Sequence, residues 1–242
     1  MNFCVKTAAI SALWAGTMSV ASVSAQTYQL PEGCAGYLTI QQRGCVVSNH
    51  YTCEADPTGH QWRVDFMENG PVFGSLIDGD TQWLQSLSLF SGQITELQAD
   101  PPDPASLDEL LETGIDTYDF TTISPDGAVT RWRGADVLTG ETVVIDGQEL
   151  LLMTYTSESD TPDGRFRNEG VNYVAPQWRL FLPGISKSFT SDGDALPESD
   201  NTPVSFIFPG EPGFFSQNPI YDCGVQDTSF PALITPRDVT QN

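Results

Sequence analysis

Turn dipeptides divide most of this 242-residue chain into short segments in which apolar and polar residues alternate. In one such segment, Trp62, Val64 and Phe66 alternate with Arg63 and Asp65, as side chains do in a half-buried strand. Asn-Gly and Asp-Gly dipeptides favour the tight turns of β-hairpins. They occur here at Asn69-Gly70, Asp78-Gly79, Asp126-Gly127, Asp146-Gly147 and Asp163-Gly164. This spacing predicts an all-β protein, an antiparallel meander curled into an open or closed barrel, or a sandwich.

One segment departs from the strand pattern. Residues 100–104 are rich in Pro and Asp, and Ser106 follows them with Glu109 three positions later, which is the pattern of a helix capping box. Gly114 is a suitable end, so we expect one short helix near 106–113. Barrels and sandwiches of roughly 200–250 residues often form one unit. We therefore expect residues 26–242 to be a single β-rich domain, loop-rich from about 183.

The first 25 residues have the composition of a cleavable secretion signal. Lys6 precedes an apolar or small run over residues 7–20, and Val23-Ser24-Ala25 supplies the small residues of a cleavage site. The run is short and rich in Ala, Ser and Thr, whereas a membrane span needs about 20 apolar residues. We expect an exported protein, periplasmic or secreted, without a transmembrane anchor.

Four cysteines follow the signal, and an even number in an exported protein predicts two disulfides. They are Cys34, Cys45, Cys53 and Cys223. If residues 45–53 form an extended strand, Cys45 and Cys53 are too far apart to be joined. A hairpin of strands 35–41 and 45–53 would instead place Cys34 beside Cys53. The expected disulfides are therefore Cys34–Cys53 and Cys45–Cys223.

Charge limits the class of partner. Lys6 is the only charged residue of the signal, so residues 26–242 carry nine of the ten basic and all 32 acidic side chains, a net charge of −23. Such a surface repels phosphate backbones and anionic lipids, and we expect no binding to nucleic acid. The charge favours solubility, although it would also attract cations or a basic partner.

The chain contains no nucleophile elbow, phosphate loop or zinc-protease motif, and we assign no catalytic residue, metal or cofactor. His50 and His60 lie near the first cysteines, but the spacing matches no compact zinc module. Acidic loops around 158–163 and 192–200 lack EF-hand spacing. A periplasmic or secreted hydrolase that uses carboxylates or either histidine is one alternative function, and a structural envelope protein is a second.

Most of the scarce basic residues lie in expected strands beside aromatic residues. They are Arg63, Arg131, Arg133, Arg165, Arg167 and Arg179. Side chains alternate along a strand, so Arg131 and Arg133 share a face opposite Trp132. Ion pairs with acids on neighbouring strands would explain this face, as would a concave surface that binds an anion. We expect a non-enzymatic protein that binds an anionic or amphipathic ligand, or a partner protein, through these arginines.

Overall fold

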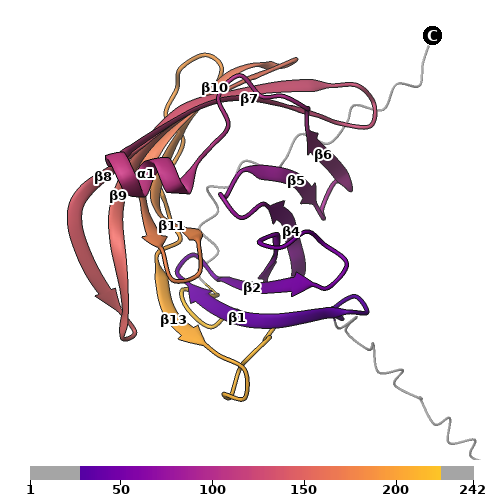
Figure 1. The fold of residues 1–242 in the computed structure, drawn as a ribbon, viewed down its shortest axis with the longest axis vertical. Coiled ribbons are helices and arrows are strands. Elements are labelled where there is room, and N and C mark those ends of the chain that lie inside the picture. Colours follow the sequence, from indigo (N-terminus) through magenta and orange to yellow (C-terminus); the bar gives the residue numbers. More distant parts are fainter. Residues whose placement is uncertain (1–27, 225–242) are drawn as a thin grey trace, which may run out of the picture.

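The computed structural model describes residues 28–224, so the expected signal lies outside the described residues. This part of the chain forms one antiparallel sheet of 13 strands and one short helix, which confirms the predicted all-β meander (Figure 1). Strands β1 to β12 are neighbours in chain order, and β13 returns to pair with β1. The strands are β1 (Cys34–Gln42), β2 (Val46–Cys53), β3 (Gln61–Met67), β4 (Gly70–Ile77), β5 (Trp83–Ser88), β6 (Gln93–Leu97), β7 (Ile115–Ile123), β8 (Val129–Ile145), β9 (Gln148–Thr161), β10 (Gly164–Ala175), β11 (Leu180–Phe189), β12 (Ser199–Asp200) and β13 (Pro203–Ile207).

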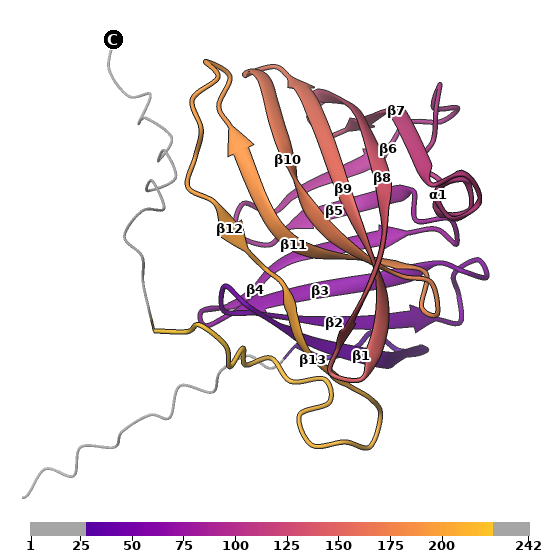
Figure 2. The ribbon, with the colours of Figure 1, turned by 90° about the vertical axis from the view of Figure 1, so that its left-hand side faces the viewer.

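The sheet curls until its two ends approach each other, and β8–β11 cross β1–β5 steeply (Figure 2). It is not closed by a continuous ladder. Instead one short segment, residues 199–207, pairs with β11 through β12 and with β1 through β13. The curl leaves an interior between the two halves of the sheet, and this interior holds the site described below.

Part of β9, β10 and β11 is buried on both faces. Tyr173 of β10 and its partner Leu182 on β11 point to the face that packs on β1 and β13. Val174, the next residue of β10, points to the opposite face, which packs on the helix. The buried side chains of the two clusters are Leu38, Ile40, Leu150, Ala175, Leu180, Leu182 and Phe206 on one side, and Leu107, Leu110, Met153 and Val174 on the other. Burial on both faces makes this the most apolar part of the sheet.

Helix α1 (Leu107–Thr113) lies where the capping pattern predicts it. The backbone N–H of Glu109 donates to the Ser106 hydroxyl at 3.1 Å, and Gly114 ends the helix with a positive φ of 85°. Leu107 and Leu110 anchor the helix on the sheet. Within residues 28–224, no helix has the length and apolar character needed to cross a membrane.

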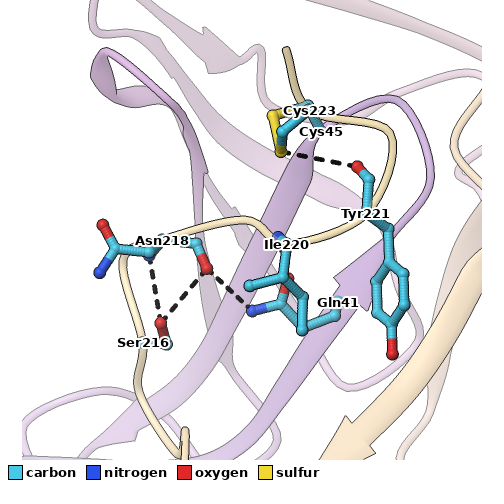
Figure 3. Close-up of a disulfide and its surroundings, with 7 residues drawn as sticks. All are labelled: Gln41, Cys45, Ser216, Asn218, Ile220, Tyr221 and Cys223. Carbon is cyan, nitrogen blue, oxygen red and sulfur yellow. Dashed lines mark hydrogen bonds between the residues drawn. A yellow bond between two sulfur atoms is a disulfide. The ribbon is translucent and has the colours of Figure 1, made fainter. Parts of the chain in front are cut away.

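Two disulfides tie the start of the domain to itself and to its end. They are Cys34–Cys53 and Cys45–Cys223, the pairs that follow from the hairpin argument. Cys34 and Cys53 are directly opposite each other in the β1–β2 ladder. Figure 3 shows the second disulfide and the C-terminal segment beside β1, where Gln41 donates to the Asn218 carbonyl and accepts from the Ile220 N–H. These contacts hold the end of the described chain against its first strand.

Strand β8 contains an irregularity, a register shift against β9 between Leu138 and Thr142. One segment differs from the expected strand pattern. Strand β11 does not stop at Pro183 but runs to Phe189, so the loop-rich part begins near residue 190 rather than 183. Pro183 is tolerated because it lies beside a register shift, where the ladder does not need its missing N–H.

A candidate ligand-binding cavity

Two adjoining hollows lie inside the curled sheet, with volumes of about 310 and 290 Å³. We name them the His50 hollow and the Asp136 hollow after a residue that lines each one. They share Thr81, Trp83, Asn172, Phe181 and Pro183, so the β4–β5 loop and strands β5, β10 and β11 contribute to both. Each is close to the size of a small-molecule site.

The His50 hollow contains a buried imidazole beside a cation. His50 is 3% exposed and lies directly opposite Arg63 on the neighbouring strand. Burial, followed by the charge of Arg63, lowers the pKa of His50 to about 3, so the ring is neutral near pH 7. The Arg63 Nε lies 3.2 Å from an Asp65 carboxylate oxygen, and its guanidinium lies 5.2 Å from the ring centre of Phe73. Arg63 is thus the positive group of this hollow.

The Asp136 hollow has aromatic walls. Its aromatic lining residues are Trp83, Tyr118, Phe120, Trp132, Tyr155 and Phe181. The ring centre of Trp83 lies 5.2 Å from that of Trp132 and 5.5 Å from that of Phe120, both in edge-to-face geometry. Such pairs fix one another's orientation, so the wall is preformed.

The polar groups of the Asp136 hollow come from neighbouring strands. Asp136 itself lies directly opposite Asp116 on one side and Tyr155 on the other. Burial, followed by the charge of Asp116, raises the pKa of Asp136 to about 7. Burial is also the largest cause that raises the pKa of Asp116 to about 6, and a hydrogen bond from the Ser106 N–H opposes it. The remaining polar lining residues include Ser157, Asn168 and Asn172.

The four arginines expected to form a binding face do share a face of the sheet. They are Arg131 and Arg133 of β8, and Arg165 and Arg167 of β10. Asp160 of the intervening strand β9 lies directly opposite both Arg131 and Arg165. Glu158, also on β9, lies directly opposite both Arg133 and Arg167. Directly opposed residues point to the same side of a sheet, so the four arginines lie on one face together with Glu158 and Asp160.

This arginine face does not line either hollow. Trp132 lies between Arg131 and Arg133 and therefore on the opposite side of β8, and Trp132 is the residue that lines the Asp136 hollow. The N–O contacts are Arg131–Asp119 at 2.5 Å, Arg133–Asp160 at 2.5 Å, Arg165–Asp160 at 2.6 Å and Arg167–Glu169 at 3.6 Å. The geometry is that of an ion-paired surface ladder, and hydrogen bonds from Arg131 and Arg165 lower the pKa of Asp119 and Asp160.

The other two arginines have separate positions. Arg63 lines the His50 hollow, as described above. Arg179 instead contacts carboxylate oxygens of Asp80 at 2.9 Å and Asp108 at 2.8 Å, so it links the β10–β11 turn to the β4–β5 loop and to α1. Of the six arginines, Arg63 alone contributes to the two hollows described here.

Other chemistries have less support from the geometry. The charged group that shifts the pKa of His50 is Arg63, whereas a hydrolytic histidine needs a carboxylate partner to orient it. Cys45, Glu68 and Cys223 lie close together, but the two sulfurs are joined in a disulfide and cannot act as thiolate ligands. The acidic residues Glu158 and Asp160 serve the arginine ladder.

Sequence reasoning missed the residues that form the hollows. It singled out Arg131 and Arg133, although Trp132 between them lines the Asp136 hollow. The sequence does contain a pattern that points to them: Tyr118, Phe120 and Trp132 all occupy the alternating strand positions that face the interior. No family model, curated protein or solved structure matches this chain.

Proposed function

We propose that this protein is exported and binds a small amphipathic molecule in the adjoining His50 and Asp136 hollows. The observation that carries the proposal is the pair of hollows with shared walls and mainly aromatic or apolar lining. Small-molecule sites have this composition, with a few polar groups that fix the orientation of the ligand. Here Arg63 and Asp136 supply a positive group in one hollow and an acidic group in the other.

Export is supported by the composition of the first 25 residues and by the two disulfides, which persist mainly in oxidising compartments. A binding role fits the His50 hollow better than histidine-dependent hydrolysis, because the charged residue opposite His50 is the cation Arg63 rather than a carboxylate that would orient the ring. A purely structural envelope protein would need no ligand-binding hollow, so the two hollows favour a binding role over this alternative.

The proposal is tested with N-phenyl-1-naphthylamine, a neutral dye whose emission rises in apolar surroundings. We expect saturable binding to the purified, oxidised protein. Trp83→Ala removes a wall shared by both hollows and should weaken binding about tenfold, the effect of losing about 1.4 kcal/mol of contact. Phe90→Ala is the matched control, because Phe90 is 71% exposed and lines neither hollow. Absence of saturable binding, or equal binding by the two variants, would refute the proposal.

A further inference from the structure

Two carboxyl groups face each other at the Asp136 hollow. Asp116 of β7 and Asp136 of β8 are directly opposed in the antiparallel ladder, and Asp136 lines the hollow. Side chains in such a pair lie on the same face with Cβ atoms about 4.5–5.5 Å apart, and like charges there repel each other. A pair of acids in this position is therefore unfavourable unless a proton or a positive group compensates it.

No basic side chain compensates this pair within the described part of the chain. The charged groups outside the pair that act on Asp116 are Glu109 of α1, Asp103 of the segment before α1, and Asp80 of the β4–β5 loop. All three are acidic and raise the pKa of Asp116 further. The charges that act on Asp116 are thus all negative, so a bound cation would be attracted to the pair, although Asp80 is itself paired with Arg179.

Two buried polar atoms near the pair also have no partner. Asp116 is 1% exposed, and its Oδ1 makes no hydrogen bond, although its Oδ2 accepts from the Ser106 N–H at 3.1 Å. Ser157 is 6% exposed and lines the same hollow, and its Oγ makes no hydrogen bond of normal geometry, although it lies close enough to the Tyr118 hydroxyl to lower the pKa of that group. Buried polar atoms are nearly always satisfied, so unpaired atoms beside a hollow indicate a group that completes them.

Aromatic rings surround the carboxyl that faces the hollow. Tyr155 is directly opposite Asp136 on β9, and Tyr118 lies two residues beyond Asp116 on the same face of β7. Trp83 and Trp132 line another part of the same hollow and contact each other. Burial raises the pKa of both tyrosines, so they stay neutral and place no phenolate charge in the hollow. The faces of such rings attract cations.

We propose that the Asp136 hollow binds an organic ammonium group, with the Asp116–Asp136 pair as counter-charge and the surrounding aromatic rings as a cage. This inference rests on the proposed function and names the chemical class of the ligand. A divalent metal fits less well, since calcium takes six to eight oxygen ligands and the walls here are largely aromatic. An ammonium group needs only one or two acceptors and gains from the ring faces.

Proton binding competes with the ammonium group. The pKa values of about 7 for Asp136 and about 6 for Asp116 mean that both carboxyls are mainly neutral at pH 5. The neighbouring groups are the acids Asp80, Asp103 and Glu109, with the Ser106 N–H as the opposing hydrogen-bond donor. Affinity for a cation should therefore fall as the pH is lowered from 8 to 5, whereas affinity for an uncharged ligand should not.

The experiment compares choline with 3,3-dimethylbutan-1-ol, its uncharged carbon analogue of the same shape, by titration calorimetry of the oxidised protein. At pH 8 we expect choline to bind at least about tenfold more tightly, and at pH 5 we expect this preference to disappear. Equal affinity for the two probes at pH 8 would overturn the inference. So would calcium binding that depends on Asp136 in a protein that shows no preference for choline.

Variants assign the preference to the pair. Asp136→Asn should abolish the preference for choline, whereas Asp119→Asn should retain it, because Asp119 also lies on β7 but faces away and binds Arg131. Binding of N-phenyl-1-naphthylamine by Asp136→Asn shows that the variant is folded. If the wild-type protein binds this dye without preferring choline, the inference fails and the proposed function stands. If the dye does not bind the wild-type protein, the proposed function fails first.

Discussion

His50 lies directly opposite Arg63 in the β2–β3 ladder, so a buried imidazole faces a guanidinium across the wall of a hollow. Protonation of His50 would place a second positive charge there. Burial of the ring, and then this repulsion by Arg63, lowers the pKa of His50 to about 3, against about 6.5 for an unfolded histidine.

This relationship predicts acid sensitivity. A group whose pKa is lowered on folding stabilises the protein above its unfolded pKa, and this stability is lost as the pH falls from about 6.5 toward 3. His50→Gln removes the effect. Between pH 7 and pH 4, its free energy of unfolding in urea should fall by about 1–3 kcal/mol less than that of the wild-type protein. Parallel pH profiles for the two proteins would contradict the prediction.

Asp136→Asn should show the opposite pH dependence. The pKa of Asp136 is raised on folding, so its protonation stabilises the protein below about pH 4, and this contribution is lost as the pH rises through about 7. Asparagine carries no charge at any pH. The variant should therefore be more stable than the wild-type protein at pH 8, on the order of 1–3 kcal/mol, with little gain at pH 4.

Thermal unfolding at the two pH values measures this difference. Asp119→Asn is the control. A hydrogen bond from Arg131 lowers the pKa of Asp119, so this substitution should lower the stability at pH 8 rather than raise it. A change in Asp136→Asn that is the same at pH 4 and pH 8 would be inconsistent with a raised pKa.

Much of the fold was accessible to sequence reasoning, because local chemistry determines it. Asn69-Gly70 makes the β3–β4 hairpin, and Asp146-Gly147 supplies two positive φ values at the β8–β9 turn. The extent of β11 was not accessible, because Pro183 is a strand breaker by composition alone. Its place beside a register shift depends on how β11 pairs with β10, and the residues around Pro183 do not specify that register.

The site was less accessible for a similar reason. Alternation shows that Arg131 and Trp132 face opposite sides, but not which side is the interior. The curl of the whole sheet decides that, and it depends on contacts between β1 and β9–β11. The opposition of Asp116 and Asp136 depends likewise on the β7–β8 register, which no single segment specifies.

The two disulfides should differ in their contribution to stability. Cys34–Cys53 closes a sequence separation of 19 residues and Cys45–Cys223 one of 178. By chain entropy these loops correspond to about 3 and 5 kcal/mol. Replacing both cysteines of each pair by serine, followed by urea unfolding, should show the larger loss for Cys45 and Cys223. A larger loss for the shorter loop would mean that the β1–β2 contacts depend on Cys34–Cys53.

Gly134 allows Tyr118 to lie against β8 in the wall of the Asp136 hollow. The two residues are directly opposed, and a Cβ on Gly134 would overlap both the Tyr118 hydroxyl and the Thr156 carbonyl oxygen. Gly134→Ala should cost about 1–3 kcal/mol of stability and weaken dye binding, because Tyr118 has to move. Gly74→Ala is the control, since its nearest neighbours would be 3.7 Å away. Unfolding and dye titrations that do not distinguish the two variants would exclude this role.

The bridge formed by residues 199–207 also affects how molecules of this protein meet. The strands at the two ends of the sheet order, β12 and β13, are only two and five residues long and belong to that one segment. A long edge strand offers unpaired N–H and C=O groups to which another chain can add. Because these edges are so short, a second molecule finds little template for intermolecular β-pairing, and the fold limits fibrous aggregation despite its 13 strands.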